Sequence, residues 1–167
     1  MEKKWLVIYT KPRWEKKVNT LLLRKGIDSW CPLNKVERQW SDRKKIIEDP
    51  LFKSYVFVNV FDQQRTEVLR TDGVLNFVHY LGKPAIVSDK EVSLIKQYLV
   101  EDETKISVIS IEGFKEKMKV KVSHGVFMNN TGQVVKANRK KAYVELQSLG
   151  QVMIVEFPNE YLTPDIK

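Results

Sequence analysis

The sequence predicts an α+β domain followed by a small β-barrel, and three features of the chain support this prediction. β-branched and aromatic runs alternate with helical periodicity over residues 1–100. The charged run EDETK then interrupts that pattern. Short β-type runs separated by turn residues fill residues 114–167, which is typical of a small barrel. We therefore expect a first domain over residues 1–100, a linker over 101–113 and a second domain over 114–167. Within the linker, residues 106–111 are apolar enough to pair with another segment.

Composition points to a globular protein with an anionic partner. The 167 residues are enough for one domain or two small ones, and a hydrophobic fraction of 43% supports a real core. Lysine and arginine number 29 against 21 acidic residues, a net charge of +8. This balance favours nucleic acid as partner, although a merely soluble basic protein fits the charge equally well.

Several classes of protein are excluded by what the sequence lacks. No apolar run is as long as the roughly 18 residues that a membrane span needs. The start, MEKKWLVIYTKPRW, has too short an apolar run for a signal peptide. Cys31 is the only cysteine, so we expect no internal disulfide, a buried inert thiol and a cytoplasmic location.

The first expected elements are a strand and a basic helix. Residues 5–10 are an apolar run typical of a strand. Pro12 favours a helix start and Gly26 favours its stop. Between them, one apolar face at helical spacing consists of Trp14, Val18, Leu21 and Leu22. The remaining helix surface is largely basic: Arg13, Lys16, Lys17, Arg24 and Lys25. It is either a solvated face or a face that follows nucleic-acid phosphates.

A second strand over residues 29–33 and a basic hairpin over 36–47 come next. The hairpin turns at Ser41-Asp42 and places basic residues around Trp40. These residues are Arg38, Arg43, Lys44 and Lys45. Trp40 either stacks on a base or packs back on its own hairpin.

The stretch EDPLFKSYVFVNV contains the main strand of the first domain. Residues 55–60 are aromatic and β-branched, as in a strand buried on both faces. Pro50 cannot donate to a strand ladder, so the chain enters this strand from an edge or a bend. Leu51 and Phe52 are expected to be a partly exposed apolar patch. The alternative is that this pair covers the core.

The first domain ends with two helices and one strand. Asp62 is expected to cap a helix over residues 63–70. A turn at Asp72-Gly73 leads into a strand over 74–80, and Gly82-Lys83-Pro84 forms the next turn. The capping box Ser88–Glu91 predicts a helix from Asp89 to about residue 100.

The second domain is expected to be all β. Its predicted strands cover residues 118–122, 132–137, 142–146 and 152–157. Gly125 and Gly132 lie at bends where a side chain would be obstructive.

No catalytic or metal site is indicated. His79 and His124 lie in different expected domains, and with one cysteine they make no zinc set of usual spacing. The sequence has no nucleophile elbow, no phosphate-binding glycine loop and no defensible Ser-His-Asp order. We therefore expect a non-enzyme with no cofactor and no metal.

Four blocks carry a family resemblance. WLVIYTKPRWEKKV, PLFKSYVFV and RTDGVLNFVHYLGKPAIV resemble, in this order, the amino-terminal domain of the NusG family of transcription elongation factors. VKVSHGVFMNNTGQVV resembles the KOW motif that closes such proteins. The resemblance implies an NGN-type α/β sandwich followed by a small SH3-like KOW β-barrel. Its KOW positions are Gly125, Phe127, Gly132 and Leu149.

The resemblance also implies a function and two partner surfaces. Such factors bind the clamp helices of the largest RNA polymerase subunit, reach toward the second-largest subunit and suppress pausing. The polymerase-binding candidates for the clamp helices are Tyr9, Leu51, Phe52, Tyr55 and Phe57. Those near the segment that faces the second-largest subunit are Gln64, Arg65 and Thr66. The candidates for contact with the non-template DNA strand are Lys11, Lys17, Arg24, Lys25 and Thr71. The KOW domain is the expected contact for Rho or a ribosomal protein.

Three departures from the family pattern stand out. Lys53-Ser54 replaces a Pro-Gly or Pro-Asn pair, which leaves the local turn geometry open. Asp72 stands where operon-specific members have arginine, and Leu149 stands where general factors have an aromatic residue. These last two favour the operon-specific branch, of the RfaH and UpxY type that acts on polysaccharide operons. The alternatives are a general NusG-like factor or an RNA- or ribosome-binding KOW protein.

Overall fold

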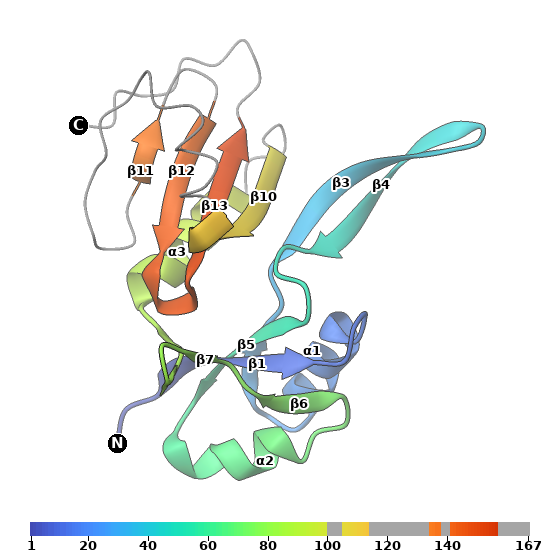
Figure 1. The fold of residues 1–167 in the computed structure, drawn as a ribbon. Coiled ribbons are helices and arrows are strands. Elements are labelled where there is room, and N and C mark those ends of the chain that lie inside the picture. Colours follow the sequence, from blue (N-terminus) through green and yellow to red (C-terminus); the bar gives the residue numbers. More distant parts are fainter. Residues whose placement is uncertain (100–104, 114–133, 138–140, 157–167) are drawn as a thin grey trace. The chain divides into compact units, whose positions relative to one another are not determined.

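The computed structural model describes residues 1–99, 105–113, 134–137 and 141–156 (Figure 1). By its internal contacts the chain divides into two compact units, Met1–Val92 and Ser93–Lys167. Among the described helices, none combines the length and the apolar character needed to cross a bilayer.

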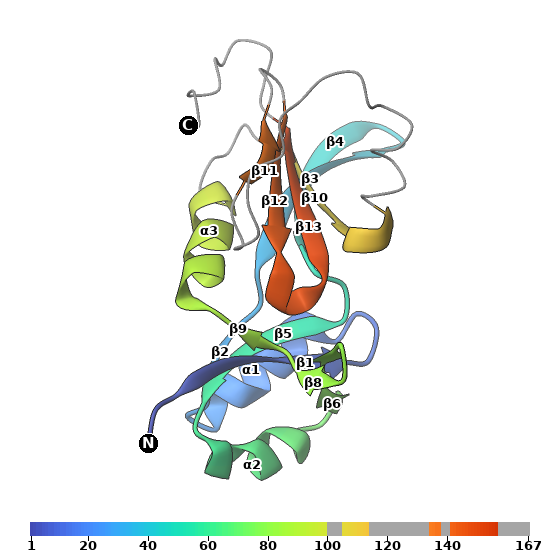
Figure 2. The same ribbon diagram turned by 60° about the vertical axis from the view of Figure 1, so that its left-hand side comes forward.

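The first unit is built on an antiparallel sheet with the strand order β2-β5-β1-β6, and β9 also pairs with β1. Its strands are β1 (Lys4–Thr10), β2 (Asp28–Trp30), β5 (Tyr55–Val60), β6 (Val74–Phe77) and β9 (Ile86–Val87). Figure 2 shows α1 (Glu15–Arg24) and α2 (Arg65–Leu69) together below β1 and β5. The expected strand over 29–33 ends earlier, at Trp30, and Leu33 begins the next strand.

The core of the first unit lies between this sheet and the two helices. Leu6 and Ile8 of β1 and alternate valines of β5 pack there against Val18 and Leu22 of α1. Val68 of α2 belongs to the same cluster, so both helices cover the same face of the sheet. The period of two along each strand gives the sheet this aliphatic face.

A long hairpin forms a separate two-stranded sheet. It consists of β3 (Leu33–Trp40) and β4 (Arg43–Pro50), and the chain turns at residues 41–42 (Figure 1). The predicted basic hairpin is therefore confirmed and longer than expected. Trp40 is 59% exposed, so it does not pack back on its own hairpin.

The start of α1 differs from the prediction. Pro12 was expected to open the helix, but the first helical residue is Glu15. Arg13 has a φ of 67°, and this left-handed conformation cannot be part of a right-handed helix. Gly26, with φ of 74°, ends the helix as expected.

The second half of the first unit contains one wrong cap and one confirmed cap. Asp62 opens a 3₁₀ turn, η1 (Asp62–Gln64), and the Gln64 side chain, not Asp62, accepts the hydrogen bond at its start. At α3 (Asp89–Leu99) the capping box is confirmed. Ser88 N–H donates to Glu91 Oε2 at 2.8 Å, and Glu91 N–H donates to Ser88 Oγ at 3.3 Å.

The expected strand over 74–80 is divided into two. β6 ends at Phe77, and β7 (His79–Tyr80) pairs with β8 (Lys83–Pro84) in a small sheet of its own. The turn between them lies at Leu81 and Gly82, both with positive φ, one residue before the predicted turn.

The second unit contains an antiparallel sheet with the order β10-β13-β12-β11. Its strands are β10 (Lys105–Ser110), β11 (Val134–Ala137), β12 (Lys141–Leu146) and β13 (Gln151–Glu156). η2 (Gln147–Leu149) joins the last two strands. The predicted α+β class, an NGN-type domain followed by a small β domain, is confirmed. The predicted strand over 118–122 and Gly125, Phe127 and Gly132 lie outside the described residues.

The expected linker differs from the structure in one respect. Residues 105–110 fall within the stretch expected to be a linker, but they form β10 and pair along their whole length with β13. Ile106 is 8% exposed, because the apolar residues of this stretch pack into the second unit. The separability of the two predicted domains stays a prediction.

Candidate functional site

β5 presents different side chains on its two faces. Val56, Val58 and Val60 belong to the aliphatic core, whereas Tyr55 and Phe57 point the other way. The register with β1 pairs Phe57 with Val7 and Tyr55 with Tyr9 on that second face. The face of the sheet away from α1 and α2 is therefore rich in aromatic residues.

Ring contacts join the aromatic residues of this second face into one chain. The ring centroids are 6.5 Å apart for Trp5–Trp30, 5.5 Å for Trp30–Phe57, 5.4 Å for Phe57–Phe52, 6.3 Å for Phe52–Tyr55 and 5.1 Å for Tyr55–Tyr9. Edge and stacked geometries of this kind stabilise a pair by about 1 kcal/mol beyond area burial. We call these six residues the aromatic face.

A tight turn carries Phe52 into the aromatic face. Ser54 has a φ of 62°, a left-handed conformation that glycine or asparagine adopts more readily. Its N–H donates to Glu15 Oε1 at 2.7 Å, and its carbonyl accepts from Thr10 N–H at 2.8 Å. Glu15 is 5% exposed, so this hydrogen bond is largely protected from water. The departure from Pro-Gly is therefore accommodated by hydrogen bonds that hold serine in the left-handed turn.

Of the two alternatives for Leu51 and Phe52, the partly exposed patch is wrong, and the structure shows the pair covering the core. Leu51 is 8% exposed and Phe52 is 3% exposed, because the turn folds this pair back against the sheet. Leu51 N–H donates to Pro32 O at 2.8 Å, and Phe52 packs on two rings. Phe57 is fully buried and Tyr9 is half-buried, so Tyr9 is the more accessible of the two.

The basic residues of α1 surround Trp14 and the turn at Gly73. Lys11 Nζ lies 5.1 Å and Lys17 Nζ lies 3.9 Å from the centre of the Trp14 ring. Lys25 Nζ donates to Thr71 Oγ1 at 3.1 Å. Of the candidates for DNA contact, Lys11 and Lys17 thus lie at the Trp14 ring. Lys25 contacts Thr71, another of these candidates. Arg24, the last residue of α1, is exposed.

The remaining predicted polymerase contacts lie elsewhere. Gln64 Oε1 accepts from Phe61 N–H at 3.0 Å, and Arg65 pairs with Asp62 at 3.0 Å. Thr66 follows in α2, the helix whose Val68 packs into the aliphatic core. The structure therefore does not bring these three residues to the aromatic face.

Cys31 and Leu149 are both buried. Burial raises the pKa of the Cys31 thiol to about 12, with a smaller contribution from Glu15 and a lowering one from Lys16. The thiol stays neutral near physiological pH, which agrees with the predicted inert cysteine. Leu149 is 4% exposed and packs inside the second unit. Within the described residues, no three His, Cys, Asp or Glu side chains form a metal cluster.

Sequence reasoning missed three tryptophans of this site. Trp5 and Trp30 belong to the aromatic face, and Trp14 lies between the basic residues instead of serving only as a core residue. The alternation along β1 placed Trp5 opposite Leu6 and was the available signal. Lys11 and Lys17 are each three residues from Trp14 in the sequence, and this spacing was the available signal for their contacts with its ring.

Comparisons with known proteins show the family to which the chain belongs. Residues 3–96 match the family model described as "Transcription termination factor nusG". A protein of Bacillus subtilis named "Transcription termination/antitermination protein NusG" is 30% identical over 87% of this chain and 88% of its own length. One of the same name from Borreliella burgdorferi is 24% identical over 97% of this chain and 98% of its length. A solved structure described as "Domain interaction in Thermotoga maritima NusG" is 19% identical over 96% of both chains, with a TM-score of 0.48.

The fold and the family match define a transcription factor without catalytic activity. The chain belongs to the NusG family. The prediction of a non-enzyme is confirmed by this family, since the relatives are named for transcription termination and antitermination.

Proposed function

We propose that this protein is a transcription elongation and antitermination factor that binds RNA polymerase through its aromatic face. The first unit binds the clamp helices of the largest subunit, extends toward the second-largest subunit and suppresses pausing. The observation that carries this proposal is the chain of ring contacts on the sheet face away from α1 and α2.

Physical chemistry supports the use of this face for binding. Aromatic residues supply large contact areas at low cost in conformational entropy, and they dominate interface energies. Tyr9 and Tyr55 hold their hydroxyl groups 3.4 Å apart, so the face also offers polar groups to a helical partner. The turn at Ser54 and Glu15 holds Phe52 in place before binding, which reduces the entropy lost on association.

The test of this proposal is Phe52→Ala. We expect it to weaken binding to core RNA polymerase by about tenfold or more, since truncating a central aromatic commonly costs about 2 kcal/mol. Fluorescence anisotropy measures the binding, and circular dichroism checks the fold. Phe52→Leu is the second variant if the alanine variant does not fold.

Leu22→Ala is the control, because it truncates a fully buried side chain of the aliphatic core that belongs to no proposed binding surface. It is expected to lower stability while a folded fraction keeps polymerase binding. If folded Phe52→Ala binds core RNA polymerase as the wild type does, Phe52 contributes only to the core, and the proposal is overturned.

Contact with the non-template DNA strand is the second part of the proposal. Lys11, Lys17, Arg24, Lys25 and Thr71 lie on or beside α1, whose apolar side packs on the sheet. Lysines and arginines on such a face give salt-dependent phosphate contacts, and polymerase binding adds a high effective concentration.

Arg24→Ala with Lys25→Ala tests this part on a paused elongation complex. The variant should lose recruitment at its target operon and keep binding to isolated clamp helices. Lys83→Ala with Lys90→Ala, which removes two exposed lysines of the same unit, is the control and should recruit normally. Recruitment of the Arg24/Lys25 variant that persists at raised salt would contradict the DNA contact.

Action on selected polysaccharide-type operons is the finer part of the proposal. Asp72 is exposed beside the basic residues, and Leu149 is buried where a general factor would offer an aromatic contact to a ribosomal partner. The alternative is a general factor whose second unit contacts Rho or a ribosomal protein. Chromatin immunoprecipitation distinguishes them: occupancy of a few operons supports specialisation, and occupancy of most transcribed genes contradicts it.

A further inference from the structure

The two faces of the β3–β4 hairpin differ in charge. Opposite residues of antiparallel strands share a face, and the register pairs Trp40 with Arg43 and Arg38 with Lys45. Asp49 belongs to this same face, because Arg38 Nη2 bonds its Oδ2 at 2.7 Å. We call this side the Trp40 face, and it carries three cations and one carboxylate.

The opposite side of the hairpin has balanced charge. Its charged residues are Lys35, Glu37, Lys44 and Glu48. Lys44 Nζ lies 3.8 Å from Glu37 Oε1, and Lys35 is directly opposite Glu48. The positive charge of the hairpin is therefore concentrated on the Trp40 face.

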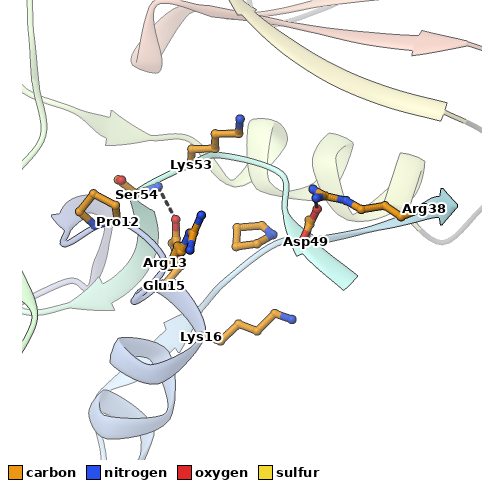
Figure 3. A pocket seen from close by; sticks show the side chains of 9 residues that line it. Pro12, Arg13, Glu15, Lys16, Arg38, Asp49, Lys53 and Ser54 are labelled. Carbon is orange, nitrogen blue, oxygen red and sulfur yellow. Dashed lines mark hydrogen bonds and ion pairs between the residues drawn. The ribbon is translucent and has the colours of Figure 1, made fainter. Parts of the chain in front are cut away.

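A cavity of about 600 Å³ lies where the Trp40 face reaches the body of the first unit. Arg38 and Asp49 line it from the hairpin, and Arg13 and Lys16 line it from the start of α1 (Figure 3). Lys53 lines it from the turn before β5.

The carboxylates of this cavity are already engaged. Glu15 accepts the Ser54 N–H and Asp49 pairs with Arg38. Among the described residues, Arg13, Lys16 and Lys53 make no salt bridge, and all three are exposed. The lining of the cavity thus contains four cations and two carboxylates, an excess of positive charge, and three of the cations are free of ion pairs with described residues.

The geometry points to this cavity as a binding site for a phosphate group of nucleic acid, at the end of a track that begins at the tip of the hairpin. Eight-residue strands span about 27 Å. One DNA strand carries about eight phosphates over that length. Arg43 lies at the tip beside Trp40, and Lys45 and Arg38 lie opposite each other two residues nearer the body of the first unit. Arg38 also lines the cavity, whose other cations continue the series.

Trp40 adds a site for base stacking to the phosphate contacts of the track. Its ring is 59% exposed at the tip, beside Arg43, and exposed aromatic side chains among cations stack on bases. A free phosphate or nucleotide would need only the cavity and would leave this cationic face unused. The inference rests on the proposed function, since the nucleic acid is the one held by the transcription complex.

The experiment compares two triple variants of the full chain. The cavity variant is Arg13→Asn, Lys16→Gln and Lys53→Gln; asparagine is chosen because it tolerates the left-handed backbone of Arg13. The control variant is Lys35→Gln, Lys44→Gln and Lys83→Gln, which removes the same charge away from the track. Each is titrated with a short fluorescein-labelled DNA duplex, and with the same single strand, over a series of salt concentrations.

The cavity variant is expected to bind DNA about tenfold or more weakly, and its log-log salt slope should fall by about 2. The control should change affinity less than about threefold and its slope by less than about 1. Equal losses in the two variants would overturn the inference. Tight binding of pyrophosphate or ATP that only the cavity variant loses would also overturn it, in favour of a free phosphate ligand.

Binding to core RNA polymerase separates this inference from the proposed function. Wild type and both triple variants should bind polymerase alike, because the aromatic face is intact in all of them. Failure of the wild type to bind polymerase would contradict the proposed function. Normal polymerase binding with equal DNA binding by both variants would contradict the cavity site alone. If the cavity binds an acidic protein surface instead of DNA, the inference of a nucleic-acid site is likewise contradicted.

Discussion

The two faces of the first sheet are made by the same strands, but one packs against helices and the other consists of contacting aromatic rings. On one face, aliphatic residues such as Leu6 and Val58 pack under α1 and α2. On the other, aromatic residues such as Tyr9 and Phe57 contact each other ring to ring. The comparison teaches that a period of two lets one strand contribute an aliphatic face to the core and a separate aromatic face on the opposite side.

The largest expected effect is on the aliphatic face. Leu22→Ala should lower the free energy of unfolding by about 4 kcal/mol, because Leu22 is fully buried and truncation leaves a cavity. Tyr9→Phe on the aromatic face should change it by less than about 1 kcal/mol, since only the 3.4 Å hydroxyl contact to Tyr55 is lost. Chemical denaturation measures both. Similar losses for the two variants would mean that the aromatic face also determines folding.

The next largest expected effect is a loss of stability when alanine replaces one of two glycines with positive φ. Gly73→Ala should destabilise by about 3 kcal/mol, because its φ is 88° and the new Cβ would lie 2.5 Å from Trp14 Cε3 and 2.9 Å from Val18 Cγ2. Gly26→Ala has a similar φ of 74° but open space, so backbone strain alone should cost about 1 kcal/mol. Thermal unfolding of the two variants separates the contact from the strain. Equal shifts would show that Trp14 moves aside freely.

The smallest effect concerns the turn that supports Phe52. Ser54→Gly should stabilise the protein by about 1 kcal/mol, because glycine adopts the φ of 62° without strain while the N–H to Glu15 is kept. Glu15→Gln should have the opposite sign, since a charge-assisted hydrogen bond becomes a weaker one. Destabilisation by Ser54→Gly would show that the serine side chain itself holds the turn.

Local signals in the sequence predicted much of the fold. The β5 run, the stop at Gly26 and the capping box at Ser88 each depend on residues close together in the chain. The starts and ends of elements were less predictable. The start of α1 depends on the left-handed Arg13, and β10 depends on pairing with β13 at the other end of the second unit. The left-handed Arg13 has no local signature, and the apolar run at 106–111 indicates that this stretch can pair but not with which strand.

The sequence by itself determined the family, the two-domain order and which residues alternate on each strand, because these follow from local composition and period. Tertiary structure alone decided which of those residues meet. Trp5 reaches Trp30 only because β1 and β2, distant in the chain, both pair with β5 in fixed registers. Arg38 and Arg13, also distant in the chain, line one cavity. Pairing register and backbone reversal bring distant side chains together, and no short window of sequence specifies them.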